Sequence, residues 1–271
     1  MMKVETDNTP ELHENCNGFS APANAEASSW EGVFSVNKPV GITSFRIVQL
    51  VRRLSGIKKV GHTGTLDPFA SGVLVVCVGR PATRLISQLM DGDKEYEAIL
   101  QLGITTETQD PEGQIVEKRP VPEITERKIE QCLAQFRGEH LQTPPVYSAL
   151  KHKGKPLYYY ARKGIKVTKA PRLIEIKELK CLSLESDSLA LKVVCSKGTY
   201  IRALAADIGE FLGCGAHLRE LKRTRNGLFS LGESLPGEQL FTEDTGRSSL
   251  FSHRMEVEKV KELLAGTTEN N

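Results

Sequence analysis

The stretch that most constrains this chain is KKVGHTGTLDPFASGVLVV, residues 58–76, in which a glycine-rich turn leads directly into an apolar run. The run GVLVVCVG at 72–79 predicts a buried strand, and it is far shorter than the roughly 20 residues of a membrane helix. Pro68 biases Asp67 away from helical angles and stiffens the turn. Gly64 and Gly72 permit special backbone angles or the close approach of a ligand. The chain therefore presents Asp67 at a rigid turn beside a buried strand.

The role of Asp67 stays open when this stretch is considered alone. An Asp-Pro pair before a strand is usually only a turn element, although loops held by rigid elements often carry catalytic side chains. A lone carboxylate can act as a nucleophile if an arginine keeps it ionised and oriented. Arg202 in KGTYIR is a candidate partner, but sequence spacing cannot bring it to Asp67. An arginine in the first turn of a helix is more often a solvated surface residue.

Hydrophobic periodicity predicts a mixed α+β chain around one large sheet. Strands are expected within GVFSVNKPVG (32–41), which ends in a Pro–Gly turn, at 72–79, at KEYEAILQLG (94–103), and at about 173–184 and 189–196. Helices are expected from Thr43 or Ser44 to Gly56, at 80–90, at 125–137 and at 201–212. Between them, TTETQDPEG (105–113) reads as a polar turn.

Three parts of the chain differ in composition. Residues 1–30 lack periodicity and are rich in polar residues, which predicts a disordered extension. Residues 31–235 are expected to form one folded domain. It would carry an exposed insertion at about 138–170 that mixes prolines, tyrosines and basic residues. Residues 236–271 predict a short tail with one helix.

Composition narrows the class of protein. The six cysteines are scattered singly with no CxxC pair, which favours a reducing compartment over a disulfide framework or a zinc site. No signal peptide is visible. The net charge is +2, but residues 1–31 carry six acids and one base, so the remainder carries +7. This excess weakly favours a polyanionic partner. No GxGxxG motif after a strand, P-loop or His/Cys cluster is present, so we expect neither a cofactor nor a metal.

Seven blocks in order resemble the TruB-type tRNA pseudouridine synthases, in the bacterial stand-alone form. The blocks are NKPVGITSF (37–45), GHTGTLDPFASGVLVVCVG (61–79), KEYEA (94–98), GITTETQDPEG (103–113), QTPPVYSALKHKGKPLYYYARKG (142–164), CSKGTYIRALAADIG (195–209) and GAHLRELKRTRNGLF (215–229). The resemblance implies a pseudouridine synthase fold, a large mixed or antiparallel sheet flanked by helices and loops with an RNA-binding insertion. Only 42 residues follow Phe229, too few for the full PUA domain that many bacterial members carry.

The resemblance also implies the catalytic residues, within a catalytic domain at 31–235. Asp67 would be the catalytic aspartate and Arg202 the arginine that pairs with it. Tyr96 would stack on the target base and take part in proton transfer. The Lys38–Pro39 turn would pack beneath the site and be mainly structural.

Further residues are implied for RNA recognition. His62 would help to hold the extruded nucleotide, and Tyr200 and Leu221 would line the uracil pocket. The insertion would grip the T-arm, although its composition alone fits a solvated loop equally well. Candidate RNA-binding residues, each with a solvated surface position as the alternative, are Lys151, Lys153, Lys155, Arg162, Lys222, Arg223 and Arg225.

The implied activity is isomerisation of uridine 55 in the T-loop of tRNA to pseudouridine, after extrusion of the base. The N1–C1′ bond breaks and the uracil is rejoined through C5, so no group is transferred in or out and no cofactor is required. We expect tRNA as the partner, with no membrane and no obligate protein partner, and a cytoplasmic monomer. Two alternatives stay open: a tRNA-refolding chaperone with secondary catalysis, and a related synthase that acts on another RNA.

Overall fold

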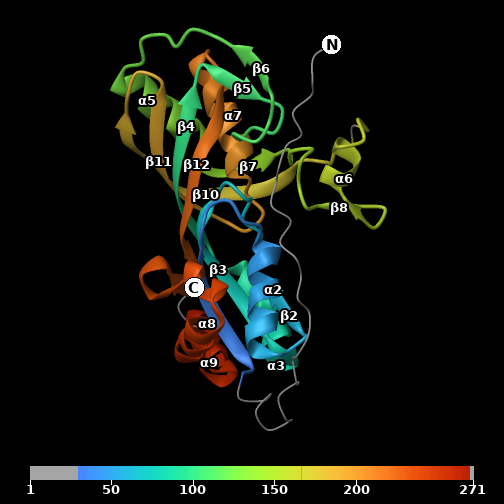
Figure 1. Cartoon of the computed structure of the whole chain (residues 1–271). Coiled ribbons are helices and arrows are strands. Elements are labelled where there is room, and N and C mark those ends of the chain that lie inside the picture. The colour runs from blue at the N-terminus through green and yellow to red at the C-terminus, as the bar shows by residue number, and fades with distance from the viewer. Residues whose placement is uncertain (1–29, 166, 269–271) are drawn as a thin grey trace, which may run out of the picture.

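A computed structural model describes residues 30–165 and 167–268 of the chain. A ten-stranded mixed sheet runs through it in the order β14-β1-β3-β12-β4-β11-β10-β7, with β2 added to β3 and β13 added to β12. Helices cover both ends of this sheet (Figure 1). The expected α+β class with one large mixed sheet is confirmed. The extension expected at 1–30 lies, apart from Trp30, outside the described residues.

One half of the sheet is built on β1 (Gly32–Lys38) and β3 (Ser71–Val78), with β2 (Val60–His62) and β14 (Leu235–Pro236) beside them. Helix α2 (Ser44–Ser55) covers one face, and its ends are the predicted ones. The Thr43 hydroxyl accepts from the Arg46 amide, and Gly56 takes a positive φ of 71°. The helix expected at 80–90 is instead two short helices on the opposite face, α3 (Gly79–Thr83) and α4 (Ile86–Asp91).

The other half consists of four antiparallel strands, β4 (Lys94–Leu102), β11 (Ser188–Cys195), β10 (Arg172–Leu184) and β7 (Gly138–Gln142). Helices α5 (Glu126–Phe136) and α7 (Ile201–Leu212) pack on one face of these strands. A small hairpin of β5 (Ile104–Thr106) and β6 (Ile115–Lys118) follows β4. Alternate residues of β4, including Tyr96, Ala98 and Leu100, are buried as predicted.

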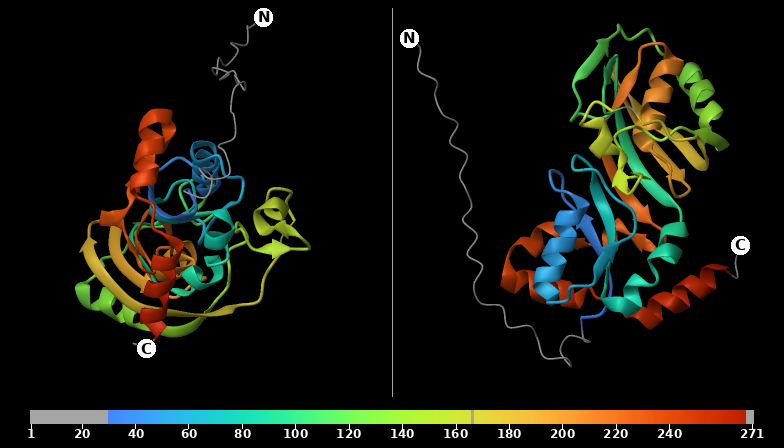
Figure 2. Two further views of the ribbon diagram at one scale, coloured as in Figure 1. Left: turned by 90° about the horizontal axis from the view of Figure 1, so that it is seen from below. Right: turned by 90° about the vertical axis from the view of Figure 1, so that its right-hand side faces the viewer.

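The two halves meet along β12 (Ala216–Asn226), as the right view of Figure 2 shows. This strand pairs with β4 along its whole length, but with β3 only at Lys222–Ser71 and Arg223–Gly72. Gly72 has a φ of 104°, and a side chain there would collide with the backbone of Arg223. The junction therefore depends on a glycine at the end of the loop that carries Asp67.

A segment at 143–165 projects from the body, as Figure 1 and the left view of Figure 2 show. It contains β8 (Lys151–His152), β9 (Lys155–Pro156) and α6 (Leu157–Ala161). Residues 138–142, placed in the insertion by the sequence, form β7 of the main sheet instead. We call residues 143–165 the projecting segment.

The prediction of one helix in the C-terminal tail is wrong. The tail forms two, α8 (Glu243–Ser252) and α9 (Val257–Thr268), after β13 (Phe229–Ser230) and two 3-10 turns. Leu250 of α8 and Val260 of α9 are fully buried against the β1–β3 half. The weak apolar pattern of EDTGRSSLFS does not predict α8, because tertiary packing rather than local periodicity stabilises it. Among the described helices, none is both long and apolar enough to span a membrane.

Candidate active site

Asp67 lies in the loop between β2 and β3, and its chain neighbours are held in place. The Ser44 hydroxyl donates to the Leu66 carbonyl at 2.9 Å and accepts from the Leu66 amide at 2.8 Å. On the other side, the Pro68 carbonyl accepts from the Gly41 amide at 2.8 Å. Both residues next to Asp67 are therefore fixed, so its carboxylate starts from a defined backbone position.

Lys38 supports this loop from below. Its side chain is fully buried, and its ammonium donates to the carbonyls of Pro39, Ile42 and Pro68 at 2.9, 2.8 and 3.3 Å. These hydrogen bonds join the turn after β1 to the Asp67 loop. Our structural interpretation of the Lys38–Pro39 turn is consistent with this position.

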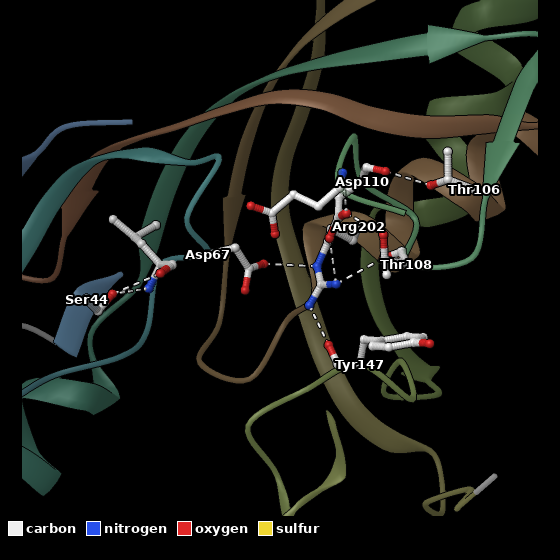
Figure 3. Close-up of polar contacts among 9 residues, drawn as sticks. Ser44, Asp67, Thr106, Thr108, Asp110, Tyr147 and Arg202 are labelled. Carbon is white, nitrogen blue, oxygen red and sulfur yellow. Dashed lines mark hydrogen bonds and ion pairs between the residues drawn. The ribbon is translucent and has the colours of Figure 1, made fainter. Parts of the chain in front are cut away.

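Arg202 meets Asp67, although 134 residues separate them in the sequence. Its Nε lies 3.0 Å from Oδ2 of Asp67 (Figure 3). The side chain is 7% exposed, because it points from the first turn of α7 into the protein. Its Nη2 donates to the Tyr147 carbonyl at 2.8 Å, and its Nη1 donates to the Thr108 carbonyl at 3.0 Å. The arginine is therefore oriented by backbone groups before any substrate is present.

Asp110 is a site residue that the sequence analysis missed. Its Oδ2 accepts from Nη1 of Arg202 at 2.9 Å, so Arg202 bridges two carboxylates instead of forming a bidentate pair with one. Asp110 is 3% exposed, and its Oδ1 accepts from the Thr108 hydroxyl and the Glu112 amide. It lies in the TTETQDPEG segment, where a polar composition concealed a buried carboxylate. We call Asp67, Arg202 and Asp110 the ionic centre.

The pKa of the Asp67 carboxyl is raised above its usual value. Burial raises this pKa most, the Arg202 charge lowers it, Asp110 raises it and Lys38 lowers it. A raised pKa makes the ionised carboxylate a stronger base and nucleophile than a solvated aspartate. About a third of the side chain remains exposed, 35%, so the carboxylate is available to a ligand.

A cavity of about 330 Å³ opens in front of Asp67. Its lining includes five of the six residues expected at the site, namely Asp67, Tyr96, Tyr200, Arg202 and Leu221. They come from the loop before β3, from β4, from the start of α7 and from β12. The fold therefore brings together residues that are far apart in sequence, in a space suited to a small planar group.

Gln142 is a second residue that the sequence did not single out. Its Oε1 accepts from the Tyr200 amide at 2.7 Å, and its Nε2 donates to the Tyr200 carbonyl at 3.0 Å. Gln142 ends β7, so this pair of hydrogen bonds attaches the base of the projecting segment to the start of α7. The position of Tyr200 in the cavity wall depends on it.

His62 does not line this cavity. It ends β2, one residue before Thr63, which does line it. Burial lowers the pKa of the imidazole, and the charge of Arg223 lowers it further, so the ring is neutral at pH 7. Its Nδ1 is buried without a hydrogen-bond partner in the described part of the chain.

The candidate RNA-binding residues fall into two groups. Lys151, Lys153, Lys155 and Arg162 are exposed on the projecting segment, and Lys155 lies 4.3 Å from the ring centre of Tyr159. Two residues of β12 face glutamates instead. Lys222 is 3.8 Å from Glu97, and Arg225 is 4.0 Å from Glu95.

The expectation that Arg223 lies on an RNA-contacting surface is wrong. It is 2% exposed, and its Nε and Nη2 donate to the carbonyls of Val73 and Gly64 at 2.7 and 3.2 Å. Strand β12 alternates, so Arg223 points to the same buried side as Leu221 while Lys222 points to solvent. An arginine enclosed in this way cannot grip a phosphate at the surface.

Two further features of the described residues bear on the chemistry. No group of three or more His, Cys, Asp or Glu side chains is arranged there to hold a metal ion. A larger hollow, of about 780 Å³, lies between α4, the turn after β12 and α9. Arg225 is the one candidate residue it contains, so we assign the chemistry to the smaller cavity.

Comparison with known proteins gives matches over most of the chain. A family model described as TruB family pseudouridylate synthase (N terminal domain) matches residues 52–201. A second model, described as tRNA pseudouridylate synthase B C-terminal domain, matches residues 202–250. A tRNA pseudouridine synthase B of Desulfotalea psychrophila is 54% identical over 238 residues, which are 86% of this chain and 96% of the relative. That of Stutzerimonas stutzeri is 50% identical over 209 residues, 77% of this chain and 68% of the relative.

Solved structures give similar matches. A chain of a Cbf5–Nop10–Gar1 complex superposes with a TM-score of 0.63 at 28% identity, covering 92% of this chain and 68% of that one. A chain of an H/ACA RNP bound to a substrate RNA containing 2′-deoxyuridine superposes with a TM-score of 0.61 at 27% identity. The superposition covers 88% of this chain and 62% of that one.

Proposed function

This chain belongs to the TruB family of pseudouridylate synthases, and on that premise we propose that it isomerises uridine 55 in the T-loop of tRNA. The observation that carries the proposal is the ionic centre at the edge of a cavity. One carboxylate, about a third exposed, faces the cavity, while its arginine partner is held by a second, buried carboxylate. The relatives from Desulfotalea psychrophila and Stutzerimonas stutzeri, which match most of the chain, both carry the name tRNA pseudouridine synthase B.

In this proposal, Asp67 is the nucleophile or acid–base group, and Arg202 orients it. Asp110 and the carbonyls of Thr108 and Tyr147 fix the arginine, which reduces the cost of reorganising the site during the reaction. Tyr96, on the buried face of β4, supplies an aromatic surface for the extruded base. Tyr200 and Leu221 complete the walls of the base pocket.

The tRNA would be held by the projecting segment, whose exposed basic residues and tyrosines suit phosphate binding and base stacking. Extrusion of the target base loses stacking worth a few kcal/mol, which these interactions would offset. His62, with its buried and unpartnered Nδ1, would act beside the extruded nucleotide. A monomer that acts in the cytoplasm is part of the same proposal.

Pseudouridine mapping tests this proposal directly. Total RNA from a strain that lacks the gene should lose pseudouridine at tRNA position 55 and keep it elsewhere. Purified protein should restore that site in the isolated tRNA and should also modify a T-arm minihelix. Loss at a ribosomal RNA site with position 55 intact would overturn the assignment in favour of another RNA substrate.

A tRNA-refolding role is the second candidate function, because the exposed basic residues Lys151, Lys153, Lys155 and Arg162 do not line the cavity of the ionic centre. It predicts that the Asp67→Asn variant, which lacks the catalytic carboxylate, still binds and refolds tRNA. The two roles are compatible, and a tRNA melting and refolding assay with the Asp67→Asn protein separates them.

A further inference from the structure

Arg223 is an unusual residue in this site, because it is buried without an acidic partner. It is 2% exposed, yet it forms no salt bridge within 4.0 Å to any carboxylate of residues 30–165 and 167–268. Its guanidinium donates to two carbonyl oxygens, those of Val73 and Gly64. Burying a charge without an opposite charge beside it is costly, so an anion that entered the cavity would reduce this cost.

The location of this charge is defined by strand pairing. Arg223 lies directly opposite Tyr96 on β4 and opposite Gly72 on β3. It contributes to the lining of the cavity that Asp67 and Tyr96 also line. Burial raises the pKa of the Tyr96 phenol, and the nearby positive charge of Arg223 opposes that effect. The guanidinium therefore belongs to the wall of the cavity in which the base is expected.

The reaction moves negative charge onto the base. If Asp67 attacks C1′, the carboxylate becomes a neutral ester, and the electron pair of the N1–C1′ bond leaves with the uracil. If Asp67 instead removes the C2′ proton, a C1′–C2′ double bond forms, and the same electron pair leaves with the uracil. By either route, one negative charge disappears from Asp67 and one appears on the base.

The two arginines of the site differ in how they can respond to this shift. Arg202 keeps Asp110 as a partner throughout, so its charge remains balanced when Asp67 becomes neutral. Arg223 has no such carboxylate among the described residues, and a new anion in the cavity would be the first to balance it. A preorganised cation at the place where charge develops is a strong form of transition-state stabilisation.

We propose that Arg223 stabilises the uracil anion formed when the N1–C1′ bond breaks, while its two hydrogen bonds to carbonyls hold the Asp67 loop in place. This inference rests on the proposed function, and it holds for both routes of bond cleavage.

The test compares two T-arm RNAs in single-turnover reactions, one with uridine and one with 5-fluorouridine at the target position. Fluorine withdraws electrons and stabilises the ring anion, so the fluorinated base requires less help from the protein. Arg223→Gln should slow consumption of uridine by about 10²- to 10³-fold. With 5-fluorouridine the deficit should be at least tenfold smaller.

Asn226→Ala is the matched control. Asn226 also ties β12 to the loop, because its Nδ2 donates to the carbonyl and the hydroxyl of Thr63 at 3.1 Å, but it carries no charge. Any loss in that variant should be equal for the two RNAs. If Arg223→Gln shows equal losses on both RNAs, or no loss, the proposal is overturned and Arg223 is only structural.

Folding is checked by thermal unfolding of each variant. Should Arg223→Gln fail to fold, Arg223→Lys decides the question in the same way. A lysine keeps the charge but cannot reach both carbonyls, so we expect a smaller deficit that again shrinks with 5-fluorouridine. If the wild-type protein consumes neither RNA, the proposed function itself fails, which is a different outcome from failure of the role of Arg223.

Discussion

The ionic centre and the projecting segment both concentrate charge, but they hold it in opposite ways. At the centre, the side chains of Arg202 and Asp110 are 7% and 4% exposed, and their polar atoms meet partners from several elements. On the projecting segment, Lys151, Lys153 and Lys155 are exposed, and Lys155 donates to its near neighbour Tyr159. Buried, fully bonded charges fix geometry, whereas exposed charges contribute long-range attraction that salt weakens. Substitutions in the two regions should therefore separate chemistry from affinity.

The largest expected effect is that of Asp67→Asn. The amide keeps the shape of the side chain but removes the nucleophilic or basic oxygen, so single-turnover conversion should fall on the order of 10⁴-fold. Binding of tRNA, measured by filter retention, should change little. Conversion at the wild-type rate would disprove a catalytic role for Asp67.

A smaller loss, of about 10²-fold in single-turnover rate, is expected for Asp110→Asn. The change leaves Arg202 with one anionic partner, so its guanidinium is free to shift relative to Asp67. Glu107→Gln removes an exposed carboxylate from the same loop and is the control, with no loss of rate expected. Equal rates for the two variants would show that Asp110 does not position the arginine.

The same Asp110→Asn protein makes a prediction about pH. Activity requires ionised Asp67, whose pKa is raised by burial, so the wild-type rate should fall on acidification at a pH above the usual aspartate value of about 3.9. Asp110 raises that pKa, and removing its charge should therefore move the acid limb to lower pH. A pH–rate profile of both proteins measures the shift, and a shift to higher pH would contradict the assignment.

The smallest effect on chemistry is expected from the projecting segment. The triple variant Lys151→Ala, Lys153→Ala and Lys155→Ala should bind tRNA about tenfold more weakly. The slope of log affinity against log salt should fall by roughly 0.7 to 0.9 for each phosphate that the protein no longer neutralises. The rate at saturating enzyme should stay within about twofold of wild type. Lys259→Ala, an exposed cation on α9, is the control. A large rate loss at saturation would show that these three lysines also shape the site.

Many of the helices and strands were predictable from local sequence patterns. The cap residues of α2, the alternation of β4 and the stripe of α7 are properties of neighbouring residues, and each element formed where these patterns placed it. The helix α8 was missed because its stability comes from partners elsewhere in the chain.

The site residues likewise divide into those that could be predicted from the sequence and those that could not. The resemblance paired Asp67 with Arg202, and the two side chains lie 3.0 Å apart. Asp110 was missed because nothing in TTETQDPEG indicates that one of its acids would be buried beneath α7. Arg223 was misjudged for a different reason. Its spacing of two from Leu221 placed it on the buried face, but a basic composition suggested solvent.

The large sequence separation between Arg223 and its hydrogen-bond partner Val73 has a consequence for when the folding chain becomes active. Its hydrogen bond to Val73 joins residues 150 positions apart, so the Asp67 loop is synthesised well before the strand that secures it. Interactions of such separation form late and slowly, since a long loop of chain must close first. During translation or refolding, the β1–β3 pairing should therefore precede catalytic competence. We therefore expect activity to appear only once β12 has paired with both β3 and β4.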